Sequence, residues 1–350
     1  MTKELTYTQA INEALHESMD ADKSVIVFGL GVDDPKRIFG TTAGLKESYG
    51  EGRVFDVPTA ENAMTGFGIG AALGGLRPVM VHQRLDFFLL AMDQLVNGAA
   101  KWHFMFGGAA SVPITVRLIV GRGWGQGPTH SQNLQAWFAH IPGLKVVMPT
   151  FPGDAKALLK ESINDNNPVV FIEHRWLHNL RGNVDDVDTV TSLGKSKVIR
   201  EGKHGTIVGM SYMTIEALRA VDHLKKFGIE MELIDLISLN PIDWPLIFKS
   251  LKKTGNLIVL DTGTETCNVA GEIIAKCSEN CWPSLKTAPK RLCPPNFPEA
   301  TSANLTKNYH PTAIDIVKAV NDQLEISFPF DALINSNPHD VPGDWFKGPF

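Results

Sequence analysis

Hydrophobic residues along this chain form two patterns that alternate, namely short unbroken runs and stretches with helical spacing. Helical spacing covers residues 5–20, 41–49, 93–106 and 152–164, while apolar runs cover residues 25–29, 54–57, 78–81, 112–118, 144–149 and 168–172. Apolar runs bounded by turn residues are typical of buried strands, and strands that alternate with helices predict a parallel sheet covered by helices. The first half of the chain is therefore expected to be an α/β domain.

The same alternation restarts beyond residue 203. Strands are predicted at residues 206–210, 230–236 and 256–261, and helices at residues 214–227, 243–254 and 269–277. Charged and polar residues dominate before this restart. The fold class is thus α/β with two parallel-sheet domains, at residues 1–182 and 204–326, joined by a linker at 183–203. A tail rich in proline and aromatic residues follows at 327–350, either without fixed structure or as a strap over a partner subunit.

Composition and charge exclude several kinds of function. The 350 residues carry a formal net charge of −5 and no dense block of Lys and Arg, so nucleic acid is not the expected partner. No run of ~18 apolar residues could span a bilayer, and the N-terminus lacks a signal-peptide pattern, so we expect no membrane association and a cytoplasmic location. Cys277 and Cys281 are spaced as on a helix, which favours thiols over a metal site.

Candidate chemistry is concentrated between Val54 and Gln94. A strand is predicted to end at Pro58, and Thr59 is expected to cap a helix that carries Glu61 in its first turn. Glycines at 66, 68 and 70 lie inside that helix, which favours close helix packing over a dinucleotide-binding turn. The pattern alone also allows Glu61 to be a simple charge at the positive helix end.

Longer motifs carry a resemblance to a known family. FDVPTAENAMTGFGIGAALGGLRPV, AMDQLVNGAAK, VPITVR and GPTHSQNLQAWFAHIPGLKVVMP occur in that order, within a match from about Leu5 to about Val320. These motifs resemble the β subunit of thiamine diphosphate-dependent 2-oxo acid dehydrogenase E1 components. The resemblance implies a transketolase-like pyrimidine-binding domain followed by a transketolase C-terminal-like domain.

The resemblance also implies roles for individual residues. Glu61 matches the catalytic glutamate that binds N1′ of the cofactor's aminopyrimidine, and Phe87 matches the aromatic residue that packs against that ring. His130, in the H-S-Q motif, matches a histidine that assists proton transfer or acyl transfer. From residue type alone, Phe87 also fits a core position and His130 a helix-capping turn.

The segment HQRLDFF, at residues 82–88, departs from the family pattern beside the expected substrate. His82 and Arg84 follow a predicted strand, and ligands bind at the carboxyl ends of strands in such sheets. We expect both side chains to face the substrate, with Arg84 able to pair with an anionic group. An ion pair between Arg84 and Asp86 or across a subunit interface is the alternative.

A structural potassium site is a further implication of the resemblance. The donors, by matching position and mostly through backbone oxygens, are Ile114, Ser162, Ile163, Asp165 and Asn167. An ordinary turn between a helix and a strand explains the same residues equally well.

The chain lacks the G-D-G and N-N element that binds Mg²⁺ and the cofactor's diphosphate in this family. A separate E1 α-like subunit is therefore expected to hold Mg²⁺, in an α2β2 assembly with contact between β subunits. Asn296 stands where many relatives have an aspartate used to dock E2, which leaves the lipoyl E2 partner open.

The leading interpretation is an enzyme subunit that decarboxylates a pyruvate-like 2-oxo acid and passes the acyl fragment to a lipoyl E2. The alternative is a two-subunit transketolase or carboligase that uses an aldehyde acceptor without E2. A regulatory subunit with a vestigial site is a third interpretation, which the presence of Glu61, Phe87 and His130 disfavours.

Overall fold

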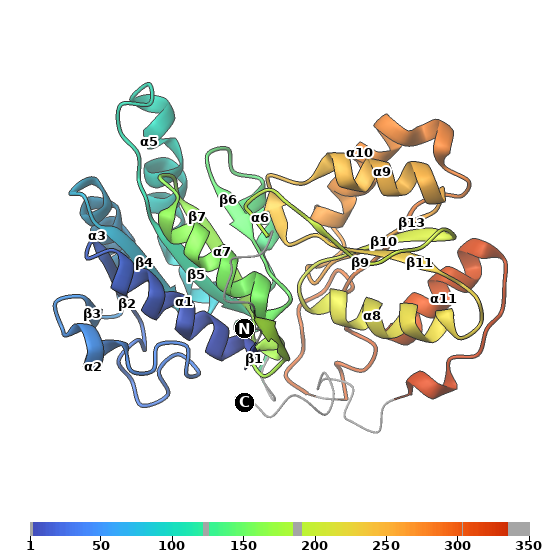
Figure 1. Cartoon of the computed structure of the whole chain (residues 1–350), viewed down its shortest axis with the longest axis horizontal. Coiled ribbons are helices and arrows are strands. Elements are labelled where there is room, and N and C mark those ends of the chain that lie inside the picture. Colours follow the sequence, from blue (N-terminus) through green and yellow to red (C-terminus); the bar gives the residue numbers. More distant parts are fainter. Residues whose placement is uncertain (1–2, 122–125, 185–190, 303, 335–350) are drawn as a thin grey trace. The chain divides into compact units, whose positions relative to one another are not determined.

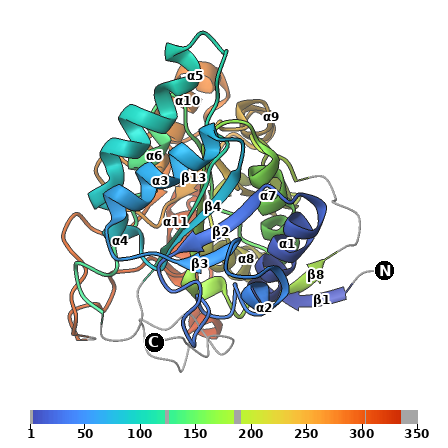
Figure 2. The same ribbon diagram turned by 90° about the vertical axis from the view of Figure 1, so that its left-hand side faces the viewer.

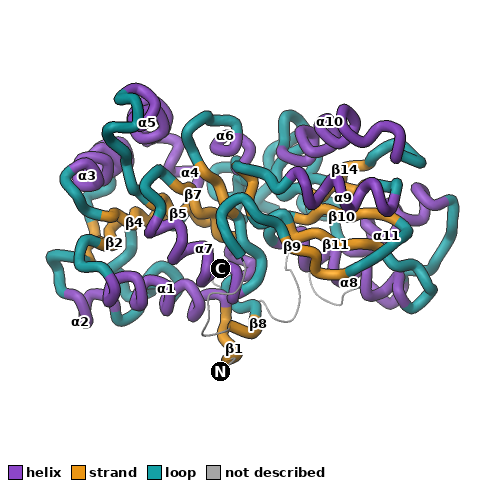
Figure 3. The backbone as a smooth tube through the Cα atoms, turned by 45° about the horizontal axis from the view of Figure 1, so that its top comes forward, coloured by secondary structure: helices purple, strands orange, loops and turns teal. Residues whose placement is uncertain are grey.

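The computed structural model describes residues 3–121, 126–184, 191–302 and 304–334. The chain divides into two compact units, built chiefly from Met1–Gly123 with Thr129–Leu193 and from Gly194–Phe346. In each unit helices enclose a central set of strands (Figure 3). Both predicted α/β domains are therefore present, and the units divide within the predicted linker.

The first unit is organised by a parallel sheet. Its strands are β2 (Val25–Gly29), β3 (Val54–Asp56), β4 (Arg77–His82), β5 (Thr115–Val120), β6 (Lys145–Val147) and β7 (Val169–His174). They lie in the order β6-β7-β5-β4-β2-β3, and every neighbouring pair is parallel. The carboxyl ends of these strands consequently meet at one edge, where the candidate residues that follow β4 lie.

Helices cover both faces of this sheet. Figure 2 shows α1 (Tyr7–Ala21) and α7 (Pro152–Asn164) on one side and α3 (Glu61–Leu73) and α5 (Ala100–Met105) on the other. A Cβ atom built on Gly68 would lie 2.9 Å from Ile114 Cδ1 and 3.1 Å from Phe28 Cζ. The missing side chain therefore lets α3 approach the sheet closely, as the glycine pattern predicted.

Shorter elements complete the first unit. They are α2 (Leu45–Tyr49), α4 (Leu85–Phe88), the 3₁₀ turns at Leu89–Ala91 and Arg175–Leu177, a π-helical segment at Gln94–Ala99 and α6 (Gln135–Ala139). The π-helical segment leads directly into α5, so the predicted helix at residues 93–106 is continuous but locally widened.

Three predictions about helix starts in this unit are wrong. Residues 5 and 6 belong to β1 (Lys3–Thr6), which pairs antiparallel with β8 (Arg181–Val184), and Thr6 instead caps α1 through a capping box. The helix expected from residue 41 begins only at Leu45, because Gly44 has a left-handed φ of 76°. Thr59 is not a cap, since α3 starts after Ala60 without a side-chain cap.

The second unit contains a five-stranded sheet in the order β14-β13-β10-β11-β9. Its strands are β9 (Lys197–Arg200), β10 (Gly205–Gly209), β11 (Met231–Asp235), β13 (Leu257–Leu260) and β14 (Lys290–Leu292), and a short β12 spans Ser238–Asn240. Only β9 runs antiparallel to its neighbour. Strand β9 and the end of β8 lie within the predicted linker at residues 183–203, so part of that linker has regular structure.

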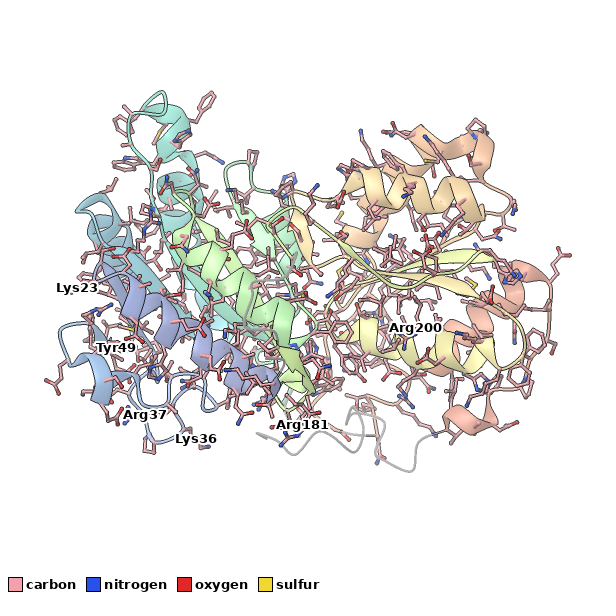
Figure 4. All side chains as sticks on the ribbon, in the orientation of Figure 1. Lys23, Lys36, Arg37, Tyr49, Arg181 and Arg200 are labelled. Atoms are coloured by element: carbon pink, nitrogen blue, oxygen red, sulfur yellow. The ribbon has the colours of Figure 1, made fainter. Side chains whose placement is uncertain are left out.

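Figure 1 shows α8 (Tyr212–Lys225) and α11 (Ala313–Leu324) on one face of this sheet and α9 (Trp244–Thr254) and α10 (Val269–Cys281) on the other. Arg200 on β9, labelled in Figure 4, forms an ion pair with Asp222 on α8 at 2.9 Å. A 3₁₀ turn at Trp282–Ser284 follows α10. The second unit is thus an α/β layer structure like the first.

The start of the tail belongs to the second unit. Phe328, Phe330 and Leu333 pack against the hydrophobic cluster that α8 and α11 form with the sheet, and a 3₁₀ turn spans Asp331–Leu333. His223 Nε2 lies 2.7 Å from the carbonyl oxygen of Pro329. The first residues of the tail are therefore held in place on the second unit, while its interpretation as a strap over a partner stays a prediction. The rest of the predicted tail lies outside the described residues.

The cysteines are free thiols, of which Cys277 and Cys281 are buried. Burial raises the pKa of the Cys277 thiol to about 12. Within the described residues, no group of three or more His, Cys, Asp or Glu side chains is arranged to hold a metal ion. The same residues include no helix that is both long enough and apolar enough to cross a membrane.

Candidate active site

Glu61 is the first residue of α3 and is only 7% exposed. Its carbonyl oxygen accepts a hydrogen bond of 2.9 Å from Thr65 Oγ1, which in turn lies 3.7 Å from Met80 Sδ on β4. The Glu61 carboxylate forms no hydrogen bond or ion pair with any residue that the structure describes. The residue is buried, but its carboxylate oxygens are not among the fully enclosed polar atoms, so the carboxylate is open to a polar group that comes from outside the chain.

Phe87 and His130 lie together. Their ring centroids are 5.3 Å apart at an interplanar angle of 89°, an edge-to-face contact. Phe87 is 41% exposed, whereas its neighbour Phe88 is fully buried, so the alternative interpretation of Phe87 as a core residue is wrong. His130 is half-buried, and its Nδ1 lies 3.1 Å from Thr129 Oγ1. The structure thus brings two residues 43 positions apart to one surface.

Arg84 and Asp86 contact the segment that carries His130. Arg84 Nη1 donates a hydrogen bond of 2.9 Å to the carbonyl oxygen of His130. Asp86 Oδ1 accepts hydrogen bonds from the backbone nitrogen of Gln132 at 3.2 Å and from its Nε2 at 2.9 Å. Within the described ranges Arg84 and Asp86 form no direct ion pair, although the charge of Asp86 partly offsets the lowering of the Arg84 pKa by burial.

His82 lies beneath α4 and is only 1% exposed. Its ring makes an edge-to-face contact with Phe88, at a centroid distance of 4.9 Å. Burial lowers the pKa of His82 to about 3, so the ring is neutral near pH 7. Neither ring nitrogen has a hydrogen-bond partner among the residues described here. The structure therefore encloses His82 instead of exposing it to a substrate.

A buried ion pair lies behind the carboxyl end of the sheet. Arg117 Nε on β5 donates a hydrogen bond of 2.7 Å to Glu173 Oε1 on β7, and both side chains are fully buried. Burial by itself would raise the pKa of Glu173, but the charge of Arg117 and the hydrogen bonds of His178 and Arg117 lower it to about 2. The sequence contained a signal for this pair, because each charge interrupts an apolar run.

Arg175 adds another buried cation at this edge. It is 1% exposed, and its guanidinium carbon lies 5.2 Å from the ring centroid of Phe39. Burial, and after it the charge of Arg84, lowers the pKa of Arg175 to about 9. Two arginines therefore follow the carboxyl ends of β4 and β7, of which the sequence pattern identified only Arg84.

The predicted potassium donors gather where α7 ends and β5 and β7 begin. Val169 N donates a hydrogen bond of 3.0 Å to the carbonyl oxygen of Ile114, which joins the two strand starts. Arg77 Nη1 donates hydrogen bonds of 3.0 Å to the carbonyl oxygens of both Ile163 and Asp165. A guanidinium group therefore already meets two of the carbonyls that were assigned to potassium.

Comparisons with known protein families find a match for each of the two units. Residues 3–179 match the transketolase pyrimidine-binding domain, and residues 194–316 match the transketolase C-terminal domain. Pyruvate dehydrogenase E1 subunit β-1 of Oryza sativa is 39% identical over 91% of this chain and 86% of its own length. The 2-oxoisovalerate dehydrogenase β subunit of Bacillus subtilis is 38% identical over 91% of this chain and 98% of its own length.

The chain belongs to the 2-oxo acid dehydrogenase E1 β-subunit family. Another relative is the β subunit of the acetoin:2,6-dichlorophenolindophenol oxidoreductase of Cupriavidus necator, which is 38% identical over 93% of this chain and 99% of its own length. Membership of the E1 β-subunit family confirms the predicted resemblance and the predicted fold. It also favours the dehydrogenase interpretation over a two-subunit transketolase.

A solved structure agrees with this fold. The split-gene transketolase, described as an inactive β4 tetramer, superposes with a TM-score of 0.74 at 22% identity, covering 93% of this chain and all of that one. At this identity the likeness concerns the fold alone. The likeness extends over nearly the whole chain and so agrees with the fold described above.

Proposed function

We propose that this chain is the β subunit of a thiamine diphosphate-dependent E1 that decarboxylates a 2-oxo acid and passes the acyl fragment to a lipoyl E2. The observation that supports this proposal most directly is Glu61, a buried carboxylate without a partner in the described structure, at the start of a helix in the pyrimidine-binding domain. The names of the relatives, which include pyruvate, 2-oxoisovalerate and acetoin, support a small 2-oxo acid or a related ketone as the substrate.

The residues present fit the aminopyrimidine half of thiamine diphosphate. Glu61 would hold a proton at N1′, a task for which a carboxyl group shielded from water is suited. Phe87 presents an exposed ring that can pack against the pyrimidine. When bound, thiamine diphosphate supplies the nucleophilic carbon that attacks the carbonyl group of the 2-oxo acid.

His130 would exchange a proton with the acyl acceptor. Its Nδ1 is placed beside Thr129 Oγ1, which leaves Nε2 for this transfer. Arg84 would use the nitrogens that do not contact His130 to bind an anionic group of the substrate. His82, enclosed beneath Phe88, would contact the substrate only after a movement of α4.

A separate α-like subunit would hold Mg²⁺ and the diphosphate, in an α2β2 assembly that also includes contact between β subunits. The outer surface of α3 suits a subunit contact, because Phe67 is 48% and Leu73 is 40% exposed. A Cβ atom built on Gly70 would meet nothing within 4 Å, so another chain could approach the helix backbone closely there. We place this assembly in the cytoplasm.

The potassium site also remains a proposal. Arg77 already donates to the carbonyl oxygens of Ile163 and Asp165, so an added cation would have to share those oxygens with a positive charge. A rise in the thermal midpoint with potassium, but not with tetramethylammonium at equal ionic strength, would support the site. Equal thermal midpoints in the two salts would argue against a potassium site, with Arg77 as the positive group bound by these carbonyl oxygens.

Co-expression with an α-like subunit tests the function. We expect the purified complex to bind thiamine diphosphate in a Mg²⁺-dependent manner and to reduce an artificial electron acceptor with a 2-oxo acid. Titration calorimetry of the isolated chain should show no such binding. Tight Mg²⁺-dependent binding by the isolated chain, or product formation only with an aldehyde acceptor, would refute the proposal.

A lipoyl domain of E2 provides the second test, because Asn296 replaces the aspartate expected to dock E2. Acylation of that domain by the complex would support an E2 partner. Transfer to the artificial acceptor without acylation of the lipoyl domain would argue for an E1-type enzyme that works without E2.

A further inference from the structure

Three contacts connect α4 to the segment at residues 130–132. Arg84 donates to the carbonyl oxygen of His130, the ring of Phe87 meets the ring of His130, and Asp86 accepts two hydrogen bonds from Gln132. All three contacts come from positions 84, 86 and 87, around the start of one short helix. They hold a segment that itself has no helix or strand.

The α4 side of these contacts is firmly fixed. Helix α4 begins almost directly after β4, the neighbour of β2 and β5 in the sheet, and Leu85 and Phe88 are fully buried. Asp86 is itself 9% exposed. Hydrogen bonds to a shielded carboxylate are stronger than neutral ones, because charge and low dielectric both favour them.

The contacts of Asp86 restrain both the backbone and the side chain of Gln132, since its Oδ1 accepts from the amide N–H and from Nε2. Arg84 restrains the peptide group two residues earlier. The backbone on both sides of Ser131 is thereby fixed, and Ser131 is 3% exposed. The direction in which the His130 side chain leaves the backbone is set by these restraints.

We propose that Asp86 and Arg84 are positioning residues that set the orientation of His130 for acyl transfer. Asp86 acts through Gln132, and Arg84 acts through the carbonyl group of His130. The functional consequence rests on the proposed role of His130, whereas the physical restraint does not. Because Asp86 contacts Gln132 and not the substrate, loss of the Asp86 restraint alone should leave binding and decarboxylation of the 2-oxo acid unchanged.

Replacement of Asp86 by Ala and by Asn separates the hydrogen bonds from the charge. Asn keeps an oxygen that can accept both hydrogen bonds from Gln132, and Ala keeps neither. Asp93→Ala is the control, because the exposed Asp93 also accepts a side-chain hydrogen bond, of 2.7 Å from Asn97, but forms none with residues 130–132 in the described structure. Gln132→Ala is a milder variant that removes only the Nε2 contact.

Hydrogen exchange of the full-length chain measures the restraint directly. We expect Asp86→Ala to speed exchange of the Gln132 amide by about 10- to 100-fold, as the loss of hydrogen bonds to a charged group implies. Asp86→Asn should fall between Asp86→Ala and the wild type, because it keeps an acceptor oxygen but loses the charge, and the Asp93→Ala control should stay within about threefold of the wild type. Unchanged exchange in both Asp86→Ala and Gln132→Ala would overturn the restraint.

Kinetics of the complete assembly measure the consequence for function. Asp86→Ala should slow acyl transfer by about tenfold or more, shift its pH profile, and leave the KM for the 2-oxo acid unchanged, with rescue in Asp86→Asn. Faster exchange with normal transfer would overturn the positioning role. Normal transfer in His130→Ala would instead refute the proposed role of His130 itself, whatever the exchange data show.

Discussion

Glu173→Gln tests the contribution of the buried ion pair to the first unit. The pKa of Glu173 is about 2 instead of 4.5, and at about 1.4 kcal/mol per tenfold change in proton affinity this gap corresponds to about 3 kcal/mol. Breaking a buried pair by removing one charge costs a similar ~3–5 kcal/mol, because the other charge stays buried. We therefore expect the variant to lose about 3 kcal/mol of stability at pH 7.

The pH dependence of this loss has a definite sign. Because the pKa of Glu173 is lower in the folded than in the unfolded state, its stabilisation is complete above about pH 4.5 and disappears as the pH falls towards 2. The stability difference between Glu173→Gln and the wild type should thus shrink steadily in acid. A destabilisation caused only by altered packing would persist at low pH.

Urea-dependent hydrogen exchange of the β5 amides reports the stability of the first unit at each pH. The control is Glu4→Gln, which removes a highly exposed ion pair of 3.6 Å with Arg181 and should cost less than about 1 kcal/mol. A Glu173→Gln variant as stable as this control, or a deficit that stays constant down to about pH 3, would refute the reasoning.

Three further predictions concern the site. Glu61→Gln should remove nearly all turnover while costing at most about 1 kcal/mol of stability, and residual activity within about tenfold of the wild type would make Glu61 a helix-end charge. His130→Ala should slow acyl transfer more than decarboxylation, and single-turnover measurements that show equal losses would contradict this role. His82→Leu should flatten the pH dependence of stability, because the low pKa of His82 allows full stability above about pH 6.5 and progressive loss as the pH falls towards 3. Parallel pH curves for the variant and the wild type would exclude this effect.

Much of the fold was predictable because the apolar spacing along the sequence matches the residues that are buried in the structure. Helix α7 has the predicted bounds, since Pro152 suits a first turn and its apolar residues recur with helical spacing. Strand β1 was not predictable, because its antiparallel partner β8 lies far along the chain and neither segment has a strong apolar pattern. Strand β9 was missed for the same reason, as its residues are mostly half-buried.

The candidate site was predictable only in part. The exposure of Phe87 and its contact with His130 agree with the roles that the family motifs imply. The spacing of these two residues in the sequence could not show that they lie close together. The hydrogen bonds from Gln132 to Asp86 cross 46 positions, and no periodicity links the two residues. The guanidinium of Arg77 likewise reaches a turn that begins 86 positions later.

Phe328 and Phe330, at the start of the tail, are part of the packing of the second unit. From the sequence these residues belong to the tail predicted at residues 327–350. In the structure Phe328 stacks on Phe227 at 5.1 Å, and Asn321 Nδ2 donates a hydrogen bond of 3.0 Å to the Phe328 carbonyl oxygen. A chain that ended before Phe328 would expose apolar surface on α8 and α11. The start of the tail is therefore part of the hydrophobic packing of the second unit, and its removal should lower the stability of that unit.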